Sequence, residues 1–144
     1  MAKLRVEIVT AERQLLAEDD VDMVVAPGNE GTLGILPKHA ALLTLLSPGV
    51  LRIKKNGQES EMAVGGGFLQ VNHDRVLVLA DTAEREDEID ETRAQEARDS
   101  AAAALQEATR GGTPIQIQAA RIALSRSMAR LTVVRHRRRR MPGS

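Results

Sequence analysis

The sequence has no cysteine, tryptophan or tyrosine, and Phe68 is its single aromatic residue. Without cysteine the chain can form neither a disulfide framework nor a cysteine-based metal site. Without aromatic side chains it has no platform on which the bases of single-stranded nucleic acid could stack. No apolar run is long enough to cross a bilayer, and we expect no signal peptide. The sequence therefore predicts a protein of the cytoplasmic side that could still dock onto a membrane complex.

Acidic residues are absent from the last part of the chain. The formal net charge is zero, yet residues 1–86 carry 9 lysines and arginines against 13 acids. From Ala108 onward there are 9 arginines and no acid. Such an asymmetry is informative about partners and docking surfaces rather than about the fold.

Residues 1–84 show short strand patterns separated by turn signals. Residues 4–9 alternate apolar and polar side chains, which is typical of a half-buried strand. Similar runs follow at residues 14–17, 21–26, 41–46, 50–55, 59–64, 68–71 and 75–80. We expect turns at the acidic stretch 18–20 and at Ser47-Pro48-Gly49, and a hairpin at Asn56-Gly57. This pattern predicts an antiparallel β-sandwich.

Some features of this region resemble catalytic motifs but lack the residues that would complete them. Gly65-Gly66-Gly67 breaks the chain after a strand, but no Lys-Ser/Thr pair and no helix follow, which favours a β-bulge or a close backbone approach over a phosphate loop. His39 could be a general base, but no serine or cysteine nucleophile pattern accompanies it. We interpret it as an interface residue within residues 31–40, a predicted exposed apolar docking loop. We predict no catalytic residue and no metal site.

From Asp87 the periodicity changes to that of helices. At about 100° per residue, one face of the first helix collects Asp90, Ala94, Ala97, Ala101, Ala104 and Ala108. Gly111-Gly112 would end this helix, and Thr113-Pro114 would start a second one. The second helix is expected from about Ile115 to Val134, with an apolar stripe of Ile117, Ala120, Leu124, Met128, Leu131 and Val134. We therefore predict an antiparallel helical hairpin over residues 85–134, whose small alanine face packs weakly enough to separate.

Residues at either end of the hairpin leave alternatives open. The acids around Asp90 fit a helix start, where they complement the helix dipole. Alternatively, Asp90 and Arg93 lie three residues apart on a helix and present both charge signs at a polar site between the two regions. The arginine-rich residues 135–144 are predicted to form a disordered tail, although such a run could also bind the phosphates of nucleic acid or anionic lipid.

Specific motifs relate the chain to a known family. The run GTLGILPKHAALLTLLSPGVLRI, then GGGFLQV and VLADTAER, occur in the order and spacing found there. From about Leu4 to Val134 the chain resembles the epsilon subunit of the bacterial F-type ATP synthase. The resemblance implies a non-catalytic, peripheral subunit of the central stalk at the cytoplasmic face of the cell membrane. Its sandwich would contact the gamma subunit and the c ring through Gly31, Leu33, Gly34, Ile35, Pro37 and His39.

The resemblance also implies a mobile hairpin that regulates ATP hydrolysis. Packed on the sandwich, the hairpin leaves the motor free. Extended along gamma, it would enter the catalytic head of alpha and beta subunits and oppose hydrolysis, with Arg121, Arg126 and Arg130 near acidic beta segments. The alternative function is a free-standing β-sandwich whose basic helical arm binds nucleic acid or anionic membrane, whereas the family interpretation expects no nucleic acid.

In some bacterial members of the family, ATP holds the hairpin down as a regulatory ligand rather than a required cofactor. The matching residues here would be Glu84, Ile89, Asp90, Arg93, Ala94, Arg126 and Arg130. Ser100 stands where a further arginine is expected. Arg98 lies two residues earlier, which on a helix turns its side chain by about 200°, so we do not expect it to substitute.

Overall fold

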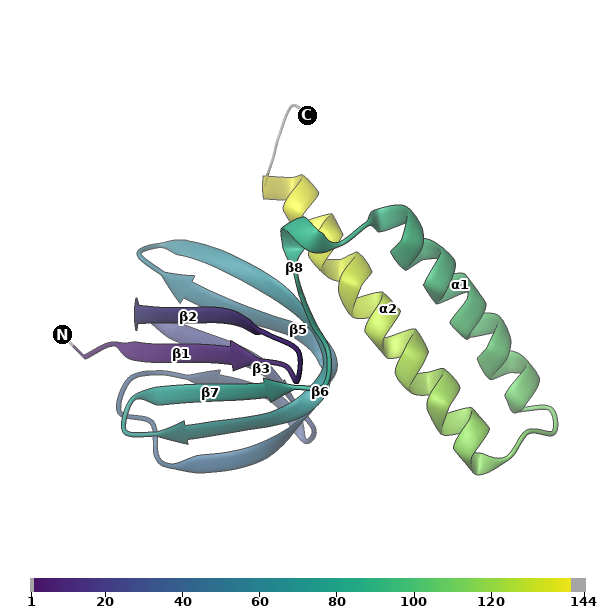
Figure 1. Cartoon of the computed structure of the whole chain (residues 1–144), viewed down its shortest axis with the longest axis horizontal. Coiled ribbons are helices and arrows are strands. Elements are labelled where there is room, and N and C mark those ends of the chain that lie inside the picture. Colours follow the sequence, from purple (N-terminus) through teal and green to yellow (C-terminus); the bar gives the residue numbers. More distant parts are fainter. Residues whose placement is uncertain (1, 141–144) are drawn as a thin grey trace.

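The structure, a computed structural model, describes residues 2–140 and consists of a β-sandwich followed by two helices (Figure 1). The strands are β1 (Leu4–Val9), β2 (Gln14–Val21), β3 (Met23–Gly28), β4 (Gly31–Ile35), β5 (Leu42–Lys55), β6 (Gln58–Asn72), β7 (Arg75–Ala80) and β8 (Ala83–Arg85). The short 3-10 helix η1 (Glu86–Glu88) leads to α1 (Glu91–Ala108) and α2 (Pro114–Arg140). The predicted fold class is confirmed.

The strands form one hydrogen-bonded path in the order β2-β1-β7-β6-β5-β3-β4, with β8 paired to β6. Neighbours on this path are antiparallel except β1 and β7, which run parallel. Because side chains alternate between the two faces of a strand, every second residue points into the core. Val6, Ile8, Leu69 and Val78 are among the side chains that are fully buried there.

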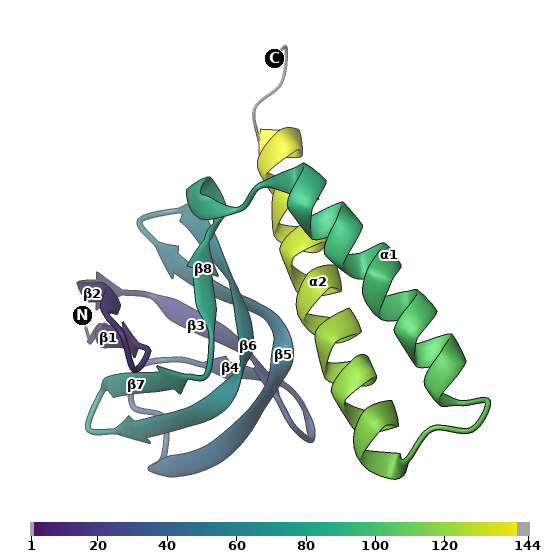
Figure 2. The ribbon, with the colours of Figure 1, turned by 45° about the vertical axis from the view of Figure 1, so that its right-hand side comes forward.

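β5 and β6 are long strands that bend together. Pro48 pairs with Gly65 and Leu46 with Gly67, so the predicted turn at residues 47–49 is wrong: these residues stay in the ladder while both strands curve around the core (Figure 2). Gly67 has a φ of +133°, and a Cβ there would lie 2.1 Å from the carbonyl oxygen of Leu79. The glycine triplet is therefore a close backbone approach, one of the two predicted alternatives, and the ladder with β5 keeps its register through it.

The acidic stretch 18–20 is also not a separate turn. It lies within β2, because the ladder with β1 continues through it as far as the pair Leu4 and Val21. A register shift interrupts this ladder between Leu4 and Val6, and Asp20 has a φ of 59° nearby. The irregularity lets the strand continue instead of reversing.

The hairpin helices begin where the sequence predicts. The Asp90 side chain caps α1 by accepting a hydrogen bond from the backbone N–H of Arg93 at 3.0 Å. At the start of α2, the Thr113 N–H donates to Gln116 Oε1 (2.9 Å) and the Gln116 N–H donates to Thr113 Oγ1 (3.2 Å). These reciprocal bonds satisfy backbone donors that a helix start leaves open.

α2 lies between α1 and the sandwich, and so it buries two faces (Figures 1 and 2). At about 100° per residue, Ser127, Leu131 and Val134 share one side, whereas Ala129 and Val133 lie almost opposite. The predicted single stripe is wrong at one position, because Met128 falls between these faces and is 53% exposed. In α1, Ala94 and Ala101 are buried as predicted, whereas Ala104 is exposed.

The predicted disordered tail is wrong for residues 135–140, which continue α2. They are helical because this end of α2 still has neighbouring elements to pack on, as shown by contacts of Arg137 and Arg138 with η1 and α1. Residues 141–144 lie outside the described residues. Within residues 2–140, neither helix combines the length and the hydropathy needed to cross a bilayer.

Candidate functional site

A cavity of about 240 Å³ lies at the joint between sandwich and hairpin. It is lined by Glu84, Glu88, Ile89, Asp90, Arg93, Ala94 and Arg130. Six of the seven residues that the family resemblance assigns to ATP are among them. The seventh, Arg126, lies in an adjoining depression whose lining also includes Glu84 and Arg130. Residues from β8, the start of α1 and α2 therefore meet at one place, although they are far apart in the sequence.

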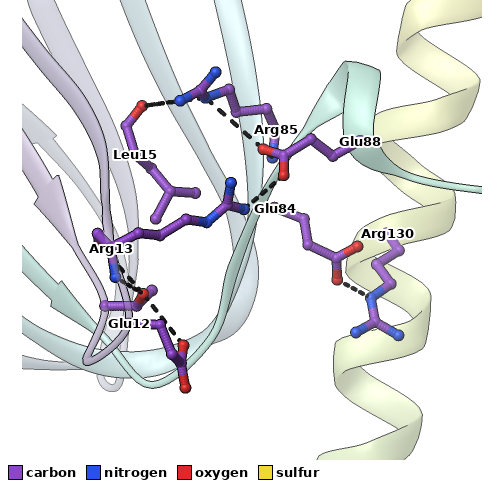
Figure 3. Close-up of polar contacts among 8 residues, drawn as sticks. Glu12, Arg13, Leu15, Glu84, Arg85, Glu88 and Arg130 are labelled. Atoms are coloured by element: carbon purple, nitrogen blue, oxygen red, sulfur yellow. Dashed lines mark hydrogen bonds and ion pairs between the residues drawn. The ribbon is translucent and has the colours of Figure 1, made fainter.

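Two arginines of α2 bind acceptors on the sandwich side of this joint. The Arg130 Nε donates to Glu84 Oε1 at 2.5 Å (Figure 3). The Arg126 Nε donates to the carbonyl oxygen of Gly65 at 3.1 Å. Only glycine allows this approach, since a Cβ at Gly65 would lie 1.9 Å from Thr82 Oγ1 and 2.8 Å from Arg126 Nε. The packed hairpin thus uses these guanidinium groups as anchors.

Asp90 and Arg93 fulfil the helix-start interpretation and also line the cavity. Asp90 Oδ1 binds the backbone N–H of Arg93, which leaves the guanidinium of Arg93 outside the cap contact. Asp90 and Arg93 are both exposed, so a ligand in the cavity could reach them from solvent. The polar-site interpretation is therefore compatible with the cap and stays a prediction.

A cluster of charges supports the edge of the cavity. Glu88 Oε2 accepts a hydrogen bond from Arg13 Nη2 at 2.6 Å, and Glu88 Oε1 accepts one from the Arg85 N–H at 3.3 Å (Figure 3). Arg85 Nη2 also donates to the Leu15 carbonyl oxygen at 2.7 Å. Burial alone would raise the pKa of Glu88, but the bonds from Arg13 and Arg85 hold that pKa below its ordinary value. Sequence reasoning missed this cluster, because Arg13 and Glu88 lie 75 residues apart with no shared motif.

Arg98 does not supply the missing arginine. Its Nη2 lies 2.9 Å from Asp99 Oδ1, and it is absent from the residues that line the cavity. Ser100, at the position where the resemblance expects arginine, is exposed. The prediction that Arg98 does not substitute is consistent with this geometry.

The predicted docking loop is partly wrong. Residues 31–35 form β4, and Ile35 is fully buried because the alternation of β4 turns it into the core beside its partner Val24. The neighbouring Leu36 is 54% exposed. The backbone N–H of Lys38 donates to Asp74 Oδ1 at 2.6 Å, which ties this loop to the turn between β6 and β7. Of the other predicted interface residues, Leu33, Pro37 and His39 are half-buried and Gly31 and Gly34 are exposed.

An exposed apolar row crosses the outer face of the sandwich, and sequence reasoning missed it. It consists of Leu43 and Leu45 on β5, Phe68 on β6 and Leu79 on β7, which are 70%, 49%, 49% and 49% exposed. Leu45 pairs with Phe68, and Phe68 pairs with Leu79, so these three side chains are direct cross-strand neighbours. Leu43 lies two residues before Leu45 and therefore on the same face of β5. The signal was present in Leu42-Leu43-Thr44-Leu45-Leu46, which is apolar on both faces of the strand. Exposed patches of this kind mark interaction surfaces.

Comparisons with known proteins match most of the chain. The family described as "ATP synthase, Delta/Epsilon chain, beta-sandwich domain" matches residues 3–86, and the corresponding "long alpha-helix domain" matches residues 87–135. An ATP synthase epsilon chain of Herpetosiphon aurantiacus is 52% identical over 137 residues, which cover 95% of this chain and 98% of that protein. An ATP synthase epsilon chain of Dehalococcoides mccartyi is 48% identical over 140 residues, covering 96% and 97%.

A solved structure has the same fold. A chain of the Euglena gracilis mitochondrial ATP synthase, in a structure of OSCP/F1/c-ring, aligns with a TM-score of 0.78 and 24% identity. The alignment covers 94% of this chain and 83% of that chain. At this identity the likeness supports the arrangement of sandwich and helices.

Proposed function

The chain belongs to the ATP synthase delta/epsilon family, and on this premise we propose that it is a non-catalytic central-stalk subunit whose helical hairpin restrains ATP hydrolysis and senses ATP. Its sandwich would join the gamma subunit to the c ring at the cytoplasmic face of a bacterial membrane. The apolar row offers a surface for gamma. The loop at residues 36–39 offers a separate contact for the ring.

The observation that carries this proposal is the cavity at the joint. Its lining comes from both sides of the boundary between sandwich and hairpin, so a ligand bound there would hold the two parts together. Carboxylates such as Asp90 can accept hydrogen bonds from a base amine or a ribose hydroxyl. Guanidinium groups such as those of Arg93 and Arg130 bind phosphate oxygens in bidentate fashion. ATP therefore fits the chemistry of the lining.

The size of the cavity limits the affinity. Pockets for drug-sized ligands occupy about 300–1,000 Å³, whereas this cavity has about 240 Å³. ATP must therefore widen the joint and compete with Glu84 for Arg130. Together with the missing arginine at Ser100, this predicts weaker binding than a preformed site would give.

Inhibition of ATP hydrolysis would depend on arginines of α2 that the packed hairpin holds against the sandwich. Arg126 and Arg130 face the sandwich while the hairpin is packed, whereas Arg121 is exposed. Separation of the hairpin would free the first two arginines for acidic segments of the beta subunits. The free-arm alternative is less well supported, because Arg137 and Arg138 bond to η1 and α1 in the packed structure.

The proposed ATP site is tested by calorimetry and thermal melting of the isolated subunit. ATP should raise the melting temperature without being hydrolysed, and a concentration of about 100 times the dissociation constant should add about 2.7 kcal/mol. Arg93→Ala should abolish the heat and the shift. Arg98→Ala is the matched control on the same helix and should retain both. Millimolar ATP that gives neither heat nor shift with the wild-type subunit would rule out this site.

A further inference from the structure

The C-terminal end of α2 binds three other elements of the chain. His136 lies against Glu61 of β6, Arg137 donates to the backbone carbonyl of Glu86 in η1, and Arg138 pairs with Glu91 of α1. We propose that His136 and Arg137 form a latch that holds the hairpin on the sandwich without any nucleotide, while Arg138 fixes the end of α2 to α1. The inference rests on the proposed mobility of the hairpin and adds a second control of it.

The central contact of this latch is a buried carboxylate. The Glu61 side chain is 3% exposed, and His136 Nδ1 lies 2.8 Å from each of its oxygens. Arg52, its cross-strand partner on β5, places Nε 3.5 Å from Glu61 Oε2. A covered carboxylate depends on such partners, because burying a charge is costly unless it is paired and hydrogen-bonded. His136 is a partner supplied by the hairpin.

Charge complementarity explains why the latch forms at this place. Glu59 and Glu61 occupy alternate positions of β6, so they share the outer face that the end of α2 covers. From Ala108 onward the chain carries only basic charges. A cavity of about 270 Å³ is lined by Arg52, Glu59, Glu61, His136 and Arg139. None of these residues lines the cavity at the joint, so the latch and the proposed ATP site are separate contacts.

The latch also explains why the arginine-rich end is helical. Consecutive arginines repel one another in solution, and an isolated helix end frays readily. Here the contacts of Arg137 and Arg138 offset that repulsion. His136 lies six residues after Arg130, about 9 Å further along the helix axis. The hairpin is thus held at two points, and release requires both to open.

The experiment measures the separation of hairpin and sandwich in the full-length subunit without nucleotide. The chain has no cysteine, so spin labels attach only where cysteines are introduced. Gln58→Cys in the sandwich and Ala119→Cys in α2 are suitable, because both positions are exposed. Glu61→Gln and His136→Gln should each raise the separated population by about tenfold or more, the range expected for a hydrogen bond to a charged group. The double variant should raise the separated population little further than either single variant, because both changes remove the same contact between Glu61 and His136. Arg135→Gln is exposed on the same turn and should change nothing.

The possible failures are distinguishable. Separation that increases with Arg130→Ala but not with Glu61→Gln or His136→Gln overturns the latch and leaves the mobile hairpin intact. A single, unchanged distance in every variant overturns the mobile hairpin and the latch together. Equal effects of Arg135→Gln and His136→Gln would show that net charge, not the contact with Glu61, holds the helix end.

Discussion

At the scale of single residues, the joint depends on carboxylates that lie against guanidinium groups. Glu84 binds Arg130 of the hairpin, and Glu88 binds Arg13 of the sandwich (Figure 3). Glu88 therefore fixes the short segment from which α1 starts, and Glu84 fixes α2 to the same place. The cavity keeps its shape because both carboxylates have partners.

Glu88→Gln tests whether the ion pair of Glu88 with Arg13 stabilises η1, and the test is the pH dependence of the unfolding free energy. Because the pKa of Glu88 is lowered in the folded protein, its stabilisation is complete above the ordinary glutamate pKa, about 4.3. It is lost as the pH falls through the lowered value. At neutral pH we expect the variant to lose about 0.5–1 kcal/mol of unfolding free energy. The difference from wild type should vanish in acid, as measured by denaturant unfolding between pH 7 and pH 3. A difference that stays constant over this range would contradict the ion-pair role.

The sequence predicts local residue roles better than distant partners. The cap at Asp90 and the capping box at Thr113 depend on residues three positions away, and both are present. The burial of Ile35 was not predicted, because glycines and proline around it resemble a loop while its pairing with Val24 places it in the core. The bond between Arg13 and Glu88 has no signal in the sequence at all, since only the fold brings them together.

At the scale of elements, α2 is the helix that joins the hairpin to the sandwich, because it contacts α1 on one side and β5 and β6 on the other. Leu131 is 4% exposed, whereas Met128 is 53% exposed on the same helix. Leu131→Ala should therefore cost about 2–4 kcal/mol of hairpin stability through lost burial and a residual cavity. Met128→Ala should change it by no more than about 0.5 kcal/mol. Helix content followed by circular dichroism during thermal unfolding measures both, and equal losses would contradict the observed orientation of α2.

The two buried faces of α2 explain what periodicity could not predict. A single apolar stripe is the pattern of a helix with one partner. α2 has two partners, and its second face combines Ala129 and Val133 with Arg126 and Arg130. The two arginines look polar in the sequence and become contacts only because Gly65 and Glu84 face them. For the same reason the sequence did not predict that residues 135–140 are helical, since Arg137 and Arg138 find their acceptors on η1 and α1 only in the folded chain.

At the scale of the whole molecule, the apolar row is the surface best suited to a permanent partner. Phe68→Glu places a charge in the middle of the row and should weaken association with the remaining ATP synthase subunits about tenfold or more. Gln58→Glu is the matched control, since Gln58 is also exposed on β6 and pairs with Lys55, which is not part of the row. Binding of each variant to complexes that lack this subunit measures the effect. Equal binding of Phe68→Glu and wild type, with both folded, would exclude the row as the docking surface.

Restraint of ATP hydrolysis by the hairpin is tested most directly by the hydrolysis rate of the assembled enzyme. A chain that ends at Arg110 lacks α2 but keeps the complete sandwich and its apolar row. We expect the enzyme with this chain to assemble and to hydrolyse ATP faster than the enzyme with the full-length chain. The restraint by the full-length chain should weaken as salt rises, because attraction between its arginines and acidic partner segments is screened. A hydrolysis rate that is the same with the shortened and the full-length chain would contradict a restraining role of the hairpin.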